Sequence, residues 1–138
     1  MTRQTYANHA YRPIAWNIAF AGATVAFVML LVDAAYDFTS ERFALALLGG
    51  VVVLGVSLTR TFALRLQNRI IRLEMQVRLA RLGRAADFDR LSLRQLIALR
   101  FASDAEMPAL IDRAIAEKLD GKQIKQAVKD WQGDYLRT

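Results

Sequence analysis

Two uncharged stretches constrain this chain more than any other feature of its sequence. Residues 14–32 read IAWNIAFAGATVAFVMLLV, and residues 43–59 read FALALLGGVVVLGVSLT. A helix as long as the first stretch measures about 28 Å, which is close to the hydrocarbon thickness of a bilayer. The second stretch is at the lower limit of that length. Together they predict a hairpin of two transmembrane helices, with residues 33–42 as the connection between them.

Two alternatives to this hairpin are open. A soluble domain could bury both stretches as its core, although a domain of 138 residues rarely holds two uncharged runs of this length. The first stretch could instead be a cleaved signal peptide, because Val32-Asp33-Ala34 has small residues in suitable places. Its length, however, exceeds the usual apolar region of about 7–15 residues in such peptides.

The charges beside the two stretches predict their direction. Residues 1–13 carry a net charge of +2, residues 33–42 carry −2 and residues 60–84 carry +6. Basic residues stay on the cytoplasmic side of a membrane, and short loops report this best. We therefore predict that both termini are cytoplasmic and that the connection faces outward. The residues expected to fix this topology and anchor the boundaries are Arg3, Arg12, Trp16, Arg60, Arg65, Arg69 and Arg72.

The basic excess of the chain does not indicate nucleic-acid binding. The formal net charge is +6, but residues 85–138, where a nucleic-acid module would lie, carry equal numbers of acidic and basic residues. No motif for catalysis, metal binding or a cofactor is present: the chain has no cysteine, and its one histidine, His9, lies in the N-terminal tail. We expect no enzyme, no cofactor, no small-molecule substrate and no nucleic-acid partner.

Small residues recur along one face of each predicted span. Their recurrence every four residues would let helix backbones approach closely in lipid. They either pack the two spans against each other or bind another protein or a second copy of the chain. The residues of this predicted packing face are Ala15, Ala19, Gly22, Ala23, Ala46 and Gly50.

The basic segment, residues 60–84, is predicted to continue the second span as one helix until Gly83. Helical spacing arranges its apolar residues in two opposed stripes, of which one has coiled-coil spacing from Ala63 to Ala80. A helix that is apolar on two sides needs two partners. One is expected to be the chain's own C-terminal region; the other is the membrane surface, a second copy or a different protein. The candidate partner residues are Leu66, Ile70, Leu73 and Val77 in one stripe and Ile71, Met75 and Leu79 in the other.

Residues 85–138 predict a small cytoplasmic region of three short helices after a linker at 86–92. Ser92 with Gln95 fits a capping box, and Ser103 with Glu106 repeats that signal. The apolar residues expected on the last helix are Ile124, Ala127, Val128, Trp131, Tyr135 and Leu136. So few residues have little independent stability, and we expect these helices to pack on the basic helix.

Four stretches together resemble a domain-of-unknown-function family of small bacterial proteins with two predicted membrane spans. They are YANHAYRPIAWNIAF, RTFALRLQNRIIRLEM, LIALRFASDAEMPAL and IKQAVKDWQGDYLR. The resemblance covers nearly the whole chain, and it implies a bacterial inner-membrane setting without assigning any site residue. The predicted fold class is thus an all-α membrane protein: a hairpin, a long basic cytoplasmic helix and three short packed helices.

The function expected from these features is non-enzymatic. A scaffold or accessory subunit of an inner-membrane complex would use helix–helix contacts, with the lipid bilayer and another membrane protein or a second copy as partners. An alternative is a sensor of anionic lipid or of the membrane surface through the arginine-rich helix. A small oligomeric transporter or channel component is a third alternative, although neither span carries the ionisable groups that ion pathways usually need.

Overall fold

The computed structural model of the protein describes residues 5–6 and 13–133. Six helices and no strand occur in this part of the chain, so the predicted all-helical fold is confirmed. The chain divides into two compact units, which are described separately. One unit comprises Arg12–Leu64, and the other consists mainly of Arg65–Arg137.

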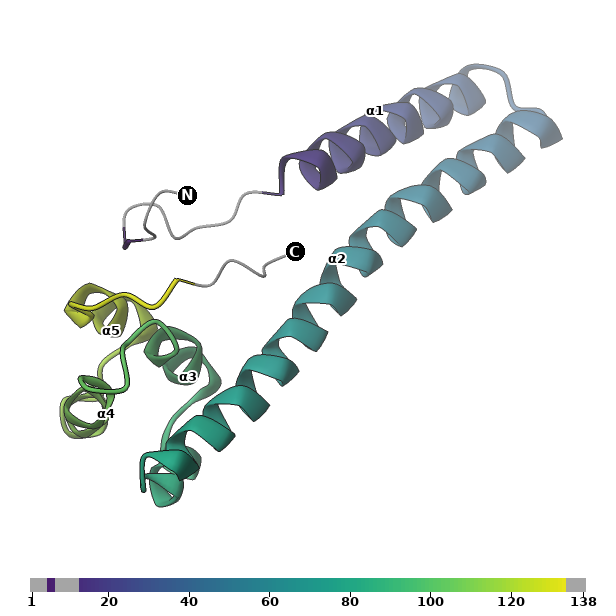
Figure 1. Ribbon diagram of the computed structural model, residues 1–138. Helices are drawn as coiled ribbons and strands as arrows, with labels where there is room; N and C mark the ends of the chain where they lie inside the picture. Colours follow the sequence, from purple (N-terminus) through teal and green to yellow (C-terminus); the bar gives the residue numbers. More distant parts are fainter. Residues whose placement is uncertain (1–4, 7–12, 134–138) are drawn as a thin grey trace. The chain divides into compact units, whose positions relative to one another are not determined.

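Two helices build the first unit. Helix α1 covers Ile14–Tyr36, helix α2 covers Ser40–Arg81, and α1 lies side by side with the first half of α2 (Figure 1). The partly or fully buried residues of α1 include Trp16, Phe20, Ala23, Phe27, Leu30 and Ala34. Those of α2 include Arg42, Ala46, Gly49, Val53, Val56 and Arg60. Both rows alternate steps of three and four residues, which is the spacing of helices that pack along their length.

Two glycines of α2 bring its backbone close to an aromatic ring of α1. A Cβ atom added to Gly49 or to Gly50 would lie 3.2 Å from a ring carbon of Phe27. Such a distance is shorter than an ordinary van der Waals contact, so a larger side chain at either position would displace the ring. The close approach of the Phe27 ring therefore explains why two successive positions of α2, Gly49 and Gly50, are glycine.

The two helices extend into the predicted connection, residues 33–42. Helix α1 continues to Tyr36 and α2 begins at Ser40, which leaves a short turn between them. Arg42 spans this turn: its Nε lies 3.2 Å from Asp33 Oδ2, and its Nη1 lies 2.8 Å from Asp37 Oδ2. The ion pairs join the end of α1 to the start of α2.

Both α1 and α2 are long and apolar enough to cross a membrane. Only 6% of the most apolar stretch of each helix is buried within the chain. A core helix of a soluble domain would bury a whole face against its own chain. These apolar surfaces are therefore available to lipid or to another protein.

Helix α2 runs through the basic segment without a break, as predicted from the lack of proline and glycine there. It ends at Arg81, two residues before Gly83, whose φ of +71° only glycine adopts without strain. The N–H of Gly83 donates to the carbonyl of Ala80, and the N–H of Arg84 donates to that of Leu79, at 3.1 and 2.8 Å. This pair of hydrogen bonds is a Schellman motif, which satisfies the last carbonyls of the helix.

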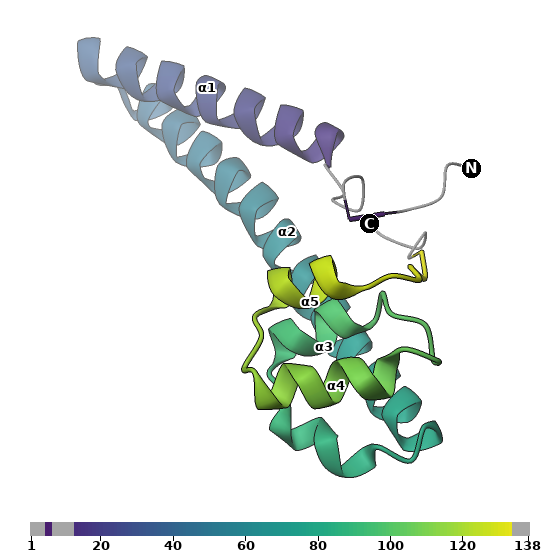
Figure 2. The same ribbon diagram turned by 90° about the vertical axis from the view of Figure 1, so that its left-hand side faces the viewer.

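The second unit packs four short helices on the end of α2 (Figure 2). They are the 3₁₀ helix η1 (Ala85–Arg90), α3 (Leu93–Leu99), α4 (Met107–Ala116) and α5 (Gly121–Ala127). Their core contains residues from every helix of the unit. Its fully buried large side chains are Met75, Leu79, Leu96, Leu99, Phe101, Met107, Ile111 and Ile124. The predicted packing of the C-terminal helices on the basic helix is thus observed.

Capping signals set where two of these helices begin. The Ser92 side chain accepts a hydrogen bond from the N–H of Gln95, and the Gln95 side chain accepts one from the N–H of Ser92, as predicted. Asp120 and Gln123 form the same reciprocal pair at the start of α5. Because each helix has only seven residues, these caps satisfy a large share of its free backbone N–H groups.

Two predictions for the start of the short helices are wrong. The linker predicted at residues 86–92 is largely the helix η1. Ser103 does not cap α4, which begins at Met107; instead the Glu106 carboxylate accepts hydrogen bonds from the N–H groups of Ser103, Lys129 and Asp130. Glu106 is therefore used to hold the segment that follows α5.

The last helix is also shorter than predicted. Helix α5 ends at Ala127, and Val128 is already extended. Trp131 instead forms an isolated antiparallel bridge with Ala102, and its ring lies 4.7 Å from the ring of Phe101. This contact buries the indole in the core of the unit, which a longer helix would not do. Tyr135 and Leu136 lie outside the described residues.

Candidate functional site

The two apolar stripes of the basic helix have different environments. Ile71, Met75 and Leu79, the core-facing row, are 4%, 1% and 0% exposed, and the short helices of the second unit cover them. This identifies the stripe that the chain's own C-terminal region covers.

The second stripe is open to solvent. The exposed row consists of Leu66, Ile70, Leu73 and Val77, which are 60%, 47%, 55% and 52% exposed. Soluble protein surfaces rarely place large aliphatic residues in a continuous line, and such surfaces often mark an interaction site. The exposed row is therefore the candidate functional site of the part of the chain that the structure describes.

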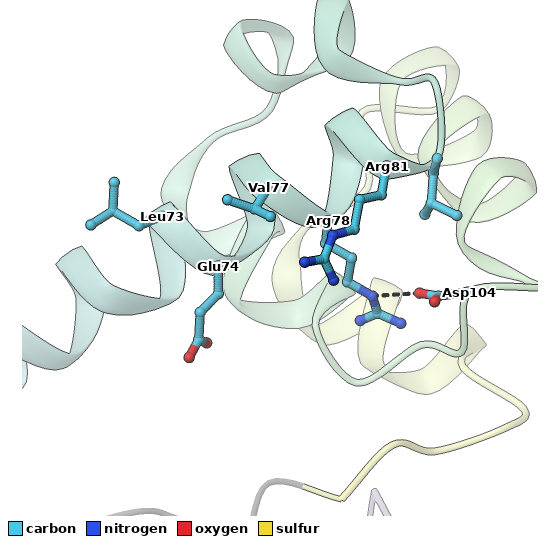
Figure 3. A pocket seen from close by; sticks show the side chains of 7 residues that line it. Leu73, Glu74, Val77, Arg78, Arg81 and Asp104 are labelled. Carbon is cyan, nitrogen blue, oxygen red and sulfur yellow. Dashed lines mark hydrogen bonds and ion pairs between the residues drawn. The ribbon is translucent and has the colours of Figure 1, made fainter.

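Two grooves lie along the part of α2 that carries the exposed row. One groove has a volume of about 550 Å³, and Leu73 and Val77 form part of its wall (Figure 3). The other residues that line it are Glu74, Arg78, Arg81, Leu82 and Asp104. The opposite groove, of about 530 Å³, is lined by Arg72, Gln76, Ala80, Ala85, Phe88 and Asp89. Leu73 and Val77 of the exposed row therefore lie at the edge of the first groove, whereas the second groove is lined by other residues of α2 and by η1.

Arg78 belongs to the structure of one groove and is not free to bind a ligand. Its Nε lies 2.6 Å from Asp104 Oδ1 (Figure 3). Its two terminal nitrogens donate to the backbone carbonyls of Arg100 and Ala102, at 3.1 and 2.7 Å. A guanidinium with these partners holds α2 against the end of α3.

Arg84 is a second structural arginine, just beyond α2. It pairs with Asp87, at 2.6 Å from Nε to Oδ2, and with Asp112 on α4. The hydrogen bonds that Arg84 donates to the carboxylates of Asp112 and Asp87 raise the pKa of Arg84, and the one to Asp112 lowers the pKa of that carboxyl group. These ion pairs join the end of α2 to η1 and α4, so they stabilise the packing of the second unit.

The remaining arginines predicted to fix the topology differ in their contacts. Arg60 lies over the ring of Trp16, with its Cζ 5.8 Å from the ring centroid, and the Trp16 indole N–H donates to the carbonyl of Val56 at 3.0 Å. Arg72 lies over Phe88 at 5.3 Å. Within the described part of the chain, Arg65 and Arg69 form no ion pair. Arg3 and Arg12 lie outside the described residues.

The predicted packing face of small residues is divided in the structure. Ala46 is 3% exposed and Gly50 contacts Phe27, so both lie between the helices, and Ala23 is partly buried there. Ala15, Ala19 and Gly22 are exposed on another side of α1. On α1 the contact is made largely by bulky side chains, such as Phe20 and Phe27. Their alternating spacing of three and four residues could have identified this face from the sequence, whereas a search for small residues alone does not find it.

Side chains that could bind a metal ion are dispersed in the described part of the chain. No group of three or more histidine, cysteine, aspartate or glutamate side chains in this part of the chain could hold a metal ion. His9 lies outside the described residues. What the arrangement offers chemically is an apolar row with charged edges, which can bind a helix or an apolar surface.

Comparison with known proteins agrees with the resemblance carried by the four sequence stretches. A family described as "Family of unknown function (DUF6526)" matches residues 1–138. No curated protein and no solved structure matches the chain. Because the family match extends over the full length, the chain belongs to the family of unknown function DUF6526.

Proposed function

We propose that this chain is a non-enzymatic integral membrane protein that acts as a scaffold or accessory subunit of a bacterial inner-membrane complex. In this proposal α1 and the first half of α2 cross the membrane, and both termini are cytoplasmic. The basic segment and the short helices then form a cytoplasmic interaction module. Its contact surface is the exposed row, Leu66, Ile70, Leu73 and Val77.

The observation that supports this proposal is that one helix has two apolar rows and the chain covers only one of them. Burying a leucine or isoleucine side chain contributes about 1.5–3 kcal/mol relative to leaving it exposed. Four such side chains, each 47% or more exposed, therefore leave several kcal/mol of binding free energy available to a partner. An uncovered apolar row on the continuation of a membrane-length helix supports an interaction role.

Photo-crosslinking in native membranes tests the proposed contact. A photoreactive amino acid is placed singly at Leu66, Leu73 or Val77, and at Arg65 as an exposed control that lies off the row. The row positions should give crosslinked products above the monomer mass, and Arg65 should not. Recovery of uncrosslinked monomer from every row position would refute the proposal.

Cysteine accessibility tests the proposed topology, because the chain has no cysteine of its own. A single cysteine in place of Tyr36, which is 88% exposed beside the turn, should react with a membrane-impermeant maleimide in spheroplasts. A cysteine in place of Gln126 on α5 should react only after the membrane is permeabilised. The reverse pattern would contradict the orientation.

A specific observation favours a second candidate, the sensing of anionic lipid. Arg65 and Arg69 lie beside the exposed row without an ion pair in the described structure, which is the pattern of a helix that binds a charged membrane surface. A solvatochromic dye on a cysteine at Leu73 discriminates the two functions in proteoliposomes. An emission shift to the blue that needs anionic lipid and disappears in high salt would favour the lipid sensor. A shift that ignores both would rule it out.

A further inference from the structure

The residues of the exposed row follow a heptad pattern. Ile70 and Val77 occupy one core position, a, and Leu66 and Leu73 occupy the other, d. In parallel coiled coils, β-branched residues at a with leucine at d favour two strands over three or four. The heptad pattern therefore indicates that the partner is a single second helix.

The charged residues beside the row fit the same arrangement. Arg69 occupies position g and Glu74 the following position e, five residues later. In a parallel coiled coil these two positions of opposite chains lie next to each other. Glu74 is the one acidic residue between positions 60 and 84, and neither it nor Arg69 forms an ion pair within the described residues. In Figure 3 the Glu74 side chain extends away from the Arg78–Asp104 pair.

The short helices of the chain leave this seam accessible. They cover Ile71, Met75 and Leu79, which occupy positions b, f and c of the same heptads. These positions lie outside the a and d seam, so a second helix and the chain's own core can contact α2 at the same time.

We propose that the exposed row is covered by a second copy of this chain in a parallel, two-stranded coiled coil. Arg69 of each copy pairs with Glu74 of the other. The proposal rests on the proposed function in one respect: two copies in the same membrane extend α2 in the same direction, as a parallel coiled coil requires. The seam from Leu66 to Val77 is short, and confinement to the membrane supplies the effective concentration that a short seam needs.

Disulfide crosslinking in native membranes tests the seam. Single cysteines replace Leu66, Ile70, Leu73 or Val77, with Arg65→Cys as the exposed control off the seam. Two differently tagged copies are expressed together so that a product of two copies is recognised by both tags. All four seam positions should give at least about tenfold more dimer than the control, because paired a and d positions meet disulfide geometry.

A charge exchange tests the ion pair. Arg69→Glu alone and Glu74→Arg alone each place like charges opposite each other twice and should weaken dimerisation by about 4- to 30-fold. The double variant with both changes should restore it. Arg94→Glu, an exposed reversal on α3, should leave it unchanged.

The outcomes separate this proposal from the proposed function. Dimers at all seam positions together with rescue by the charge exchange would establish the coiled coil. Photo-crosslinks from the row that contain one copy and a different protein would overturn it while supporting the scaffold function. Dimers at one end of the row only would also overturn it, because that pattern indicates two helices that cross at one point and diverge along the rest of the row. No crosslinked product of any kind would overturn both.

Discussion

The substitution Leu79→Ala should weaken the second unit more than most others. Leu79 is 0% exposed and packs in the core between α2 and the short helices. Replacing a fully buried leucine by alanine costs about 2–5 kcal/mol, since a cavity remains where the side chain was. A unit of this size has a stability of only about 4–10 kcal/mol. The substitution therefore removes a large fraction of its free energy of unfolding.

Hydrogen exchange measured by mass spectrometry on the full chain in detergent checks this magnitude. A loss of about 2 kcal/mol increases the exchange rate of protected amides about thirtyfold, and larger losses increase it further. The effect should appear in α3 and α4, while amides of α1, in the other unit, keep their rates. Amide exchange measures the opening of the second unit itself, so the result does not depend on which partner the chain binds.

Leu93→Ala is the matched control. It makes the same chemical change in the same unit, but Leu93 is 39% exposed at the start of α3. Its effect should stay within about 0.5 kcal/mol. If Leu79→Ala and Leu93→Ala gave equal exchange rates, the assignment of Ile71, Met75 and Leu79 to the core would be refuted.

Three further predictions concern local features. Because Arg84 lowers the pKa of Asp112, this ion pair stabilises α4 above the ordinary carboxyl pKa of about 4 and is lost as the pH falls through the lowered value. Asp112→Asn should remove that part of the pH dependence of amide exchange. Gly50→Leu should lower the melting temperature in detergent by overpacking the hairpin at a cost of about 1–3 kcal/mol, and Gly55→Leu, at a site with open space, should not. Ser92→Ala removes the cap of α3 and should raise exchange of that helix about fivefold; unchanged exchange would contradict the role of the capping box.

Much of the fold was predictable because its signals are local. The two apolar stretches, the unbroken basic helix and the capping box at Ser92 each depend on a few neighbouring residues. The cap at Asp120 could have been found in the same way, since Gln123 follows it at the required spacing.

The remainder depends on contacts between distant residues. Val128 and Trp131 continue an apolar helical pattern, yet the indole packs on Phe101, thirty positions earlier, and the helix ends first. For the same reason the sequence could not tell which apolar stripe of the basic helix is covered. Both stripes are equally apolar, and only the assembled core distinguishes Met75 from Leu73.

The core-facing row of α2 also has a consequence for the order of synthesis. Leu79 leaves the ribosome about fifty residues before Trp131, the last residue of the core that covers it. At about 5–20 residues per second this delay lasts roughly 3–10 seconds. During that time both sides of the helix expose apolar side chains, and a chain interrupted before Trp131 never buries them. Completion of the C-terminal helices during synthesis therefore determines whether the core-facing row of α2 is buried or stays exposed to chaperones and proteases.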